Sequence, residues 1–266
     1  MDNKPSRDRI YVELRDEVLA GTIQASTLIR TQEIVGRFAC TDKAAREVLV
    51  ALVHDGYLEL GRERAFRGPD WLPTQLDEQV SQVIALQDFC VMRLAQGDTL
   101  GLQKLCSIRQ RIEDAPKDSE ERFQIALEWV RVLFAVGGGV NLGELAAKII
   151  PPAFFRVVWI ADCGDHQTFT SAIGDVLELA TAGHVEAARD HHPRFWDSVR
   201  EPIQLFLKVR SEGRARVTRS GDPTAVRDLS LTGSSPAFGR SLRDRNMMLP
   251  RLGERRSRAR IPSRPL

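Results

Sequence analysis

The sequence predicts a mainly α-helical protein with two folded domains, and three observations support this fold class. Apolar residues recur every three or four positions through most of residues 1–212, which is the spacing of amphipathic helices. Two short strand patterns interrupt this spacing near residue 60. Beyond residue 212 the periodicity ends, and arginine, serine, glycine and proline dominate. We therefore predict domains at residues 1–68 and 79–212, a linker at 69–78 and a disordered basic tail at 213–266.

Composition limits the class of protein further. The chain has 266 residues and is 42% hydrophobic, which suits two modest domains with apolar cores. No apolar run approaches the ~20 residues of a membrane helix, and the start of the chain is polar, so we expect no membrane segment, no secretory signal and a cytoplasmic location. The four cysteines lack metal or redox spacing, and we interpret them as free thiols: Cys40, Cys90, Cys106 and Cys163.

The charge is unevenly distributed along the chain. The net charge is +2, but residues 212–266 hold 13 arginines against 5 acidic residues, a local net charge of +8 that leaves −6 for residues 1–211. A nucleic-acid interface must therefore depend on local placement of cations rather than on overall basicity. The tail itself would add sequence-independent DNA affinity, or it is a solvated appendage or an acquired extension.

The first domain begins with a predicted helix over residues 7–20. Ile10, Leu14 and Val18 recur every four residues and form one apolar face, and Gly21 supplies the stop.

Two further short helices follow, each with a threonine suited to cap its start. Thr31 precedes an inward face of Ile34, Val35 and Phe38. Thr41 opens the next helix, whose apolar residues also share one face: Ala45, Val48, Leu49, Leu52 and Val53. Gly56 ends it. Strands at residues 57–60 and 65–67, with a turn at 61–64, then complete the pattern of a winged helix-turn-helix.

A helix enters the major groove only if one face packs on the protein while the other presents hydrogen-bond donors. Lys43 and Arg46 lie three residues apart on the outer face of the third helix. Arg30 precedes the second helix, and two arginines lie at the tip of the wing. The alternative is that these are ordinary solvated side chains. The candidate DNA-binding residues are Arg30, Thr41, Lys43, Arg46, Arg62 and Arg64.

Three motifs carry a family resemblance: Ile29–Val35 with Arg37 and Phe38, Ala45–Leu49, and His54–Leu58. On these, residues 7–67 resemble the N-terminal domain of the GntR family of bacterial transcription regulators. The resemblance implies that Arg30 and Arg46 contact DNA and that the wing reaches a groove.

The chain departs from the family pattern at the start of the third helix. The family's Ser-Arg is Thr41-Asp42 here, and its proline is Ala44. An acid in place of arginine removes a DNA contact and adds repulsion, which Lys43 would offset in part.

The second domain is predicted as an all-α bundle. Gly137–Gly139 is expected to stop one helix, Asn141 to cap the next, and Pro193 and Pro202 to interrupt the last. The predicted helices cover residues 79–94, 100–113, 120–136, 143–150, 153–161, 168–182 and 185–209.

The order of motifs in this domain resembles the effector-binding (FCD) domain of the fatty-acid-regulator branch of the GntR family. The matching segments are Glu120–Phe123, Leu133–Gly137, Asn141–Leu145, Val176–Gly183 and Glu186–Ala188. The resemblance implies a bundle that binds a small organic effector, such as an acyl-CoA or an organic acid.

Many members of that branch bind a divalent metal through one Asp and three His. Those positions fall near Ala126, Val130, Ile173 and Phe195, which cannot ligate a metal. Other metal-binding residue types lie in sequences typical of turns: Asp162, Asp165, His166, His191 and His192. We therefore predict no metal and no cofactor.

Apolar side chains at the metal positions suit a hydrophobic effector cavity, although aromatic residues at helical spacing also form ordinary cores. The candidate lining residues are Phe123, Trp129, Phe134, Phe155 and Trp159, with Phe154 and Trp196 as further candidates.

No catalytic motif is present, so we predict that the protein is not an enzyme. The predicted function is a GntR-type, ligand-responsive regulator, expected to be a repressor. It would bind double-stranded DNA as a homodimer and control a metabolic operon. The alternative is a degenerate relative that binds a ligand or partner without reading a specific operator.

Overall fold

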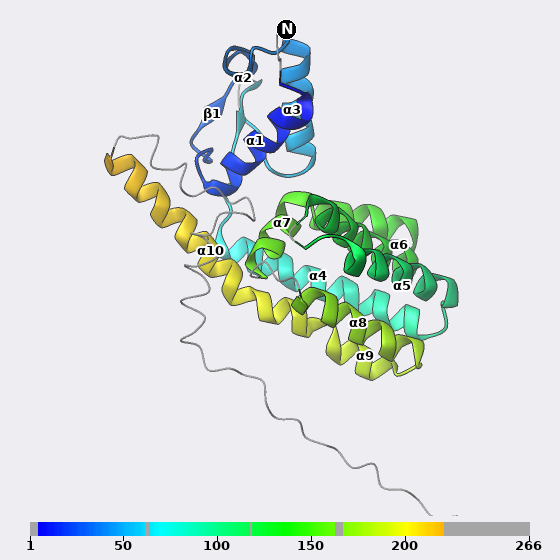
Figure 1. Cartoon of the computed structure of the whole chain (residues 1–266). Helices are drawn as coiled ribbons and strands as arrows, with labels where there is room; N and C mark the ends of the chain where they lie inside the picture. The colour runs from blue at the N-terminus through cyan, green and yellow to red at the C-terminus, as the bar shows by residue number, and fades with distance from the viewer. Residues whose placement is uncertain (1–4, 62–63, 118, 163–166, 221–266) are drawn as a thin grey trace, which may run out of the picture.

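The computed structural model describes residues 5–61, 64–117, 119–162 and 167–220, and it divides into two lobes (Figure 1). A small N-terminal lobe of three helices and a sheet sits beside a larger lobe made only of helices. The mainly α fold predicted from sequence, a winged helix-turn-helix followed by a helical bundle, is confirmed.

The N-terminal lobe contains α1 (Arg7–Ala20), α2 (Thr31–Phe38) and α3 (Asp42–His54). Its sheet is antiparallel in the order β1-β3-β2. The strands are β1 (Leu28–Ile29), β2 (Glu59–Leu60) and β3 (Phe66–Arg67). β2 and β3 are the two strands of the predicted wing. β1 was not predicted, because two residues are too few to show a period-two pattern.

Capping residues set two of the helix ends as the sequence indicates, but the prediction that Thr31 caps α2 is wrong: Arg30 occupies the N-cap position and Thr31 is the first helical residue. The Thr41 hydroxyl accepts the Ala44 N–H at 3.2 Å and starts α3. Gly21 closes α1 with a φ of 82°, a left-handed conformation that favours glycine. Behind these caps, Leu14 and Leu49 are fully buried where α1 packs against α3.

The bundle consists of seven helices in the described part of the chain. α6 is central and packs on α4 and α5, while α8 packs on α5 and α9, and α10 on α4 and α7. The helices are α4 (Pro73–Ala95), α5 (Thr99–Asp114), α6 (Glu120–Ile149), α7 (Pro152–Ala161), α8 (Gln167–Thr181), α9 (Val185–His191) and α10 (Pro193–Ser220).

Several boundaries differ from those expected because proline starts helices as well as ending them. Pro73 lies in the first turn of α4, so that helix occupies the second half of the expected linker 69–78. Pro193 starts α10 in the same way, whereas Pro202 lies inside α10 without ending it. α10 reaches Ser220, so the part of the expected tail from 213 to 220 is helical; the remainder lies outside the described residues.

The predicted stop at Gly137–Gly139 is present as a kink. The label α6 covers two helices that meet there, and Gly139 has a non-helical backbone, with φ 78° and ψ 178°. Gly137 allows α6 to approach α4 closely, because a Cβ there would lie 2.6 Å from the Cβ of Cys90. The run therefore marks a helix crossing and a kink.

By length and composition α6 is the one described helix that could cross a membrane, contrary to the expectation that no apolar run was long enough. Its apolar residues pack on α4, α5 and α7. The central helix of a bundle meets the same criteria.

Candidate nucleic-acid interface and effector cavity

The outward face of α3 is the candidate DNA-reading surface. Ala45, Leu49 and Leu52 are buried on the packed side, as predicted. Lys43 and Arg46 point to solvent, with side chains 86% and 61% exposed. Helical spacing places further exposed residues on the same side: Asp42, Glu47, Val50 and His54.

The charges on this face pair with one another. Arg46 lies 3.6 Å from the Asp42 carboxylate, and Lys43 lies 3.9 Å from the Glu47 carboxylate. Glu47 also accepts from Arg7 of α1 at 2.5 Å. Exposed pairs of this kind contribute about 0–1 kcal/mol, so DNA phosphates can replace the carboxylates as partners.

Arg30 and Thr41 lie beside this face. Arg30 is exposed at the N-cap position of α2, where Glu33 accepts its backbone N–H at 3.4 Å. Thr41 is exposed, with its hydroxyl engaged in the cap of α3. The Gln32 amide donates to Asp42 at 3.5 Å and joins the starts of the two helices. This bond brings the start of α2, which follows Arg30, next to the start of α3, which follows Thr41.

For the wing, the structure describes one of the two candidate arginines. Arg64 is exposed, with a φ of 61°. Arg62 lies outside the described residues. Arg67 on β3 donates to Glu59 on β2 at 2.8 Å, an ion pair across the two strands.

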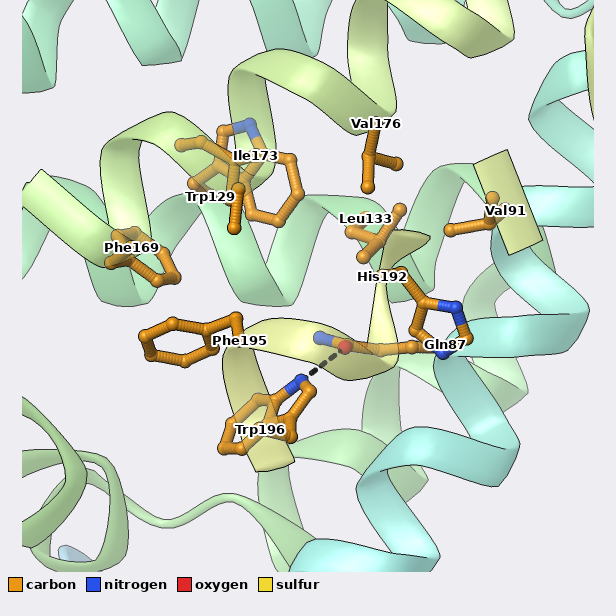
Figure 2. A pocket seen from close by; sticks show the side chains of 11 residues that line it. Gln87, Val91, Trp129, Leu133, Phe169, Ile173, Val176, His192, Phe195 and Trp196 are labelled. Atoms are coloured by element: carbon orange, nitrogen blue, oxygen red, sulfur yellow. Dashed lines mark hydrogen bonds between the residues drawn. The ribbon is translucent and has the colours of Figure 1, made fainter. Parts of the chain in front are cut away.

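A small apolar cavity lies inside the bundle (Figure 2). Its volume is about 30 Å³, and α4, α6, α8 and α10 supply most of its walls. The lining residues are Gln87, Val91, Trp129, Leu133, Phe169, Ala172, Ile173, Val176, His192, Phe195 and Trp196. Ile173 and Phe195, two of the positions at which the sequence resemblance would place metal ligands, are thus part of the cavity wall.

Of the aromatic residues proposed from sequence for the cavity, Trp129 lines it, as does Trp196 from the further candidates. Phe123, Phe155 and Trp159 pack on one another behind it, with ring centroids 5.7–6.0 Å apart. Phe134 is fully buried in the core, and Phe154 stacks on Trp196. Phe169 joins the cluster to the cavity, because its ring contacts both Phe155 and Phe195.

Two polar residues of the cavity wall carry no signal in the sequence. Gln87 is buried on α4 and accepts from the Trp196 indole N–H at 2.6 Å (Figure 2). His192 is also buried, which corrects the expectation that it lies in a surface turn. Its ring nitrogens lie 2.9 Å and 3.0 Å from the carbonyl oxygens of Arg189 and Ile84, tying the start of α10 to α4.

The structure assembles no metal centre in the parts of the chain that it describes, where no three His, Cys, Asp or Glu side chains come together. Asp165 and His166 lie outside those parts. Asp162 accepts the Phe169 N–H at 3.3 Å, and His191 lies 3.7 Å from Asp175.

Buried arginines join the two lobes at two places. Arg15 of α1 donates to Glu120 of α6 at 2.9 Å, and Arg156 of α7 binds the same carboxylate. The Arg156 guanidinium also lies 3.3 Å from the centre of the Phe123 ring, in the aromatic cluster behind the cavity. Burial would raise the pKa of Glu120, but Arg156 and Arg15 lower it below its ordinary value.

The second junction is formed by Arg210 in the second half of α10. Its guanidinium donates to the Val18 carbonyl at 3.0 Å and lies 4.7 Å from the centre of the Trp71 ring. Val18 is in the last turn of α1, where a helix favours a cation. Gly21 permits the approach, because a Cβ there would meet the Arg210 side chain at 3.0 Å.

This geometry defines a winged helix-turn-helix joined to an all-α bundle, a fold shared with solved structures of bacterial regulators. Lar, described as controlling expression of the Listeria monocytogenes agr system and mediating virulence, is similar with a TM-score of 0.57 at 13% identity; the match covers 76% of this chain and 97% of Lar. A candidate transcriptional regulator GntR from Rhodococcus sp. RHA1 is similar with a TM-score of 0.52 at 16% identity, covering 74% and 97%. No family model and no curated protein matches the sequence.

Proposed function

We propose that this protein is a DNA-binding transcriptional regulator of the GntR type, and not an enzyme. The observation that carries the proposal is α3: its apolar side packs on α1 and α2, while Lys43 and Arg46 stand exposed beyond it. Phosphates and guanine edges accept from such cations in the major groove. A homodimer in the cytoplasm, reading a palindromic operator, follows from the same proposal.

The bundle is proposed to respond to a small organic effector and to release DNA on binding it, as in a repressor. The cavity supports an apolar ligand, since nine of its eleven lining residues are apolar or aromatic, and the two polar ones, Gln87 and His192, are engaged in hydrogen bonds. At about 30 Å³ it holds little more than water, whereas ligand pockets span about 300–1,000 Å³. An acyl-CoA or organic acid would therefore bind an opened bundle and shift the population toward that state.

A mobility-shift experiment on DNA flanking the gene tests the DNA-binding proposal. At physiological salt, Arg46→Ala should weaken binding about tenfold or more, because one base or phosphate contact is lost. Arg131→Ala is the matched control, since Arg131 is exposed on α6, away from α3. Equal binding by wild type and Arg46→Ala would contradict the assignment of α3.

A thermal-shift screen with acyl-CoAs and organic acids tests the effector. Val176→Phe should fill the cavity and abolish the shift given by a ligand, whereas Val140→Phe, on the exposed surface of α6, should preserve it. An unchanged shift in Val176→Phe would locate the effector elsewhere.

A second candidate function is supported by the ion pairs on α3. Asp42 and Glu47 neutralise Arg46 and Lys43, as expected of a degenerate relative that binds ligands or partners without operator recognition. Binding that is only salt-sensitive and sequence-independent would favour this candidate.

A further inference from the structure

Asp42 is the unusual residue of the proposed reading face, because an acid faces a polyanion there. It is the first residue of α3, the end of a recognition helix that contacts base edges. Its carboxylate is not used for the helix cap, since Thr41 performs that role. Its side chain is half exposed and is held between Arg46 on α3 and Gln32 on α2.

We propose that Asp42 and Arg46 recognise two adjacent base pairs together, an inference that rests on the proposed function. Asp42 would accept a hydrogen bond from the N4 amino group of a cytosine. Arg46 would donate to a guanine on the adjacent base pair. Cytosine presents only a donor in the major groove, and guanine presents only acceptors. A carboxylate therefore suits the first base and a guanidinium the second.

The spacing of the two groups fits adjacent base pairs. The Asp42 and Arg46 side chains approach to 3.6 Å, and base pairs stack about 3.4 Å apart. The ion pair places the guanidinium beside the carboxylate before DNA binds, and a guanidinium has five N–H donors, more than one carboxylate can engage.

The alternative is that Asp42 only repels DNA phosphates and so lowers the affinity for DNA of any sequence. Glu47 provides a matched control for that role. It is an acid on the same outward side of α3, five residues further on, and it pairs with Lys43 and with Arg7, a residue of α1. Removing either negative charge should strengthen binding to phosphates, but only Asp42 is expected to alter base preference.

Selection from a random DNA library with the full-length protein, followed by affinity measurements on the selected sites, tests the pair. Wild type should enrich a site containing adjacent G·C and C·G pairs, and replacing that cytosine with thymine should weaken binding about tenfold. Asp42→Asn should lose this discrimination and gain affinity for other sequences. Glu47→Gln should gain affinity without changing any base preference.

The outcomes separate this inference from the proposed function. If Asp42→Asn selects the wild-type site with unchanged cytosine preference, the pair is refuted while the regulator remains. If wild type selects a site with adenine opposite Asp42, the cytosine assignment is likewise refuted. Arg46→Ala is expected to select no specific sequence. If wild type also selects none, specific operator recognition is refuted, and the proposed role of the Asp42–Arg46 pair is refuted with it. Circular dichroism confirms that each surface variant is folded.

Discussion

Arginines serve two different purposes in the two regions of this molecule. On α3, Arg46 is largely exposed and lies 3.6 Å from its acidic partner. Between the lobes, the Arg15 side chain is only 11% exposed and Arg210 is buried; their bonds to Glu120 and Val18 hold the two domains together. Burial, not residue type, therefore decides whether an arginine can bind a ligand or is held in a structural contact.

The largest effect that would test this contrast is expected from Arg210→Ala. The change removes a charged hydrogen bond to Val18 and the contact with Trp71, which should lower the free energy of unfolding by about 2–3 kcal/mol. Denaturant unfolding measures the loss. Arg194→Ala, an exposed position on the same helix, should change stability by about 0.5 kcal/mol or less. Similar losses of unfolding free energy in the two variants would contradict the structural role of the buried arginine.

A smaller effect is expected from Glu120→Gln, about 1 kcal/mol at neutral pH, because Glu120 is half exposed and solvent weakens its bonds to Arg15 and Arg156. Its pKa is lower in the folded than in the unfolded protein. Its contribution is therefore present above the unfolded-state pKa of ~4.3 and is lost as pH falls through the folded value. Unfolding midpoints between neutral and acid pH should show this loss in wild type. If Glu120→Gln loses as much stability as wild type between neutral and acid pH, the role of Glu120 is contradicted.

The smallest effect on stability is expected on α3. Arg46→Ala should change the free energy of unfolding by no more than about 0.5 kcal/mol, since its ion pair with Asp42 is exposed. The same variant should lose DNA affinity. A thermal melt beside the mobility-shift experiment checks both, and a marked loss of stability would mean that Arg46 is structural.

Local sequence predicted the N-terminal helices well because each has its own signals. Thr41 caps α3, Gly21 closes α1, and the buried faces follow the apolar periodicity. β1 lacked such a signal, because its two residues are specified by pairing with β3, which is far away in sequence.

The bundle cavity was harder to predict for the same reason. Trp129 was named from its type, but Gln87 and His192 look like ordinary polar residues until α10 packs on α4. Arg210 lies just before the basic tail, and nothing in its neighbours along the chain distinguishes it from arginines such as Arg214.

The sequence by itself determined the N-terminal helices, the caps at Gly21 and Thr41, the wing and the set of cations on the outer face of α3, because these depend on neighbours within one or two turns. Only the tertiary structure decided which charged side chains are held in structural contacts and which stay exposed. It pairs Asp42 with Arg46 on an open surface, and it buries Arg210 against Val18 across 192 positions of chain. Burial and long-range partners are set by the packing of whole elements, so no local pattern records them.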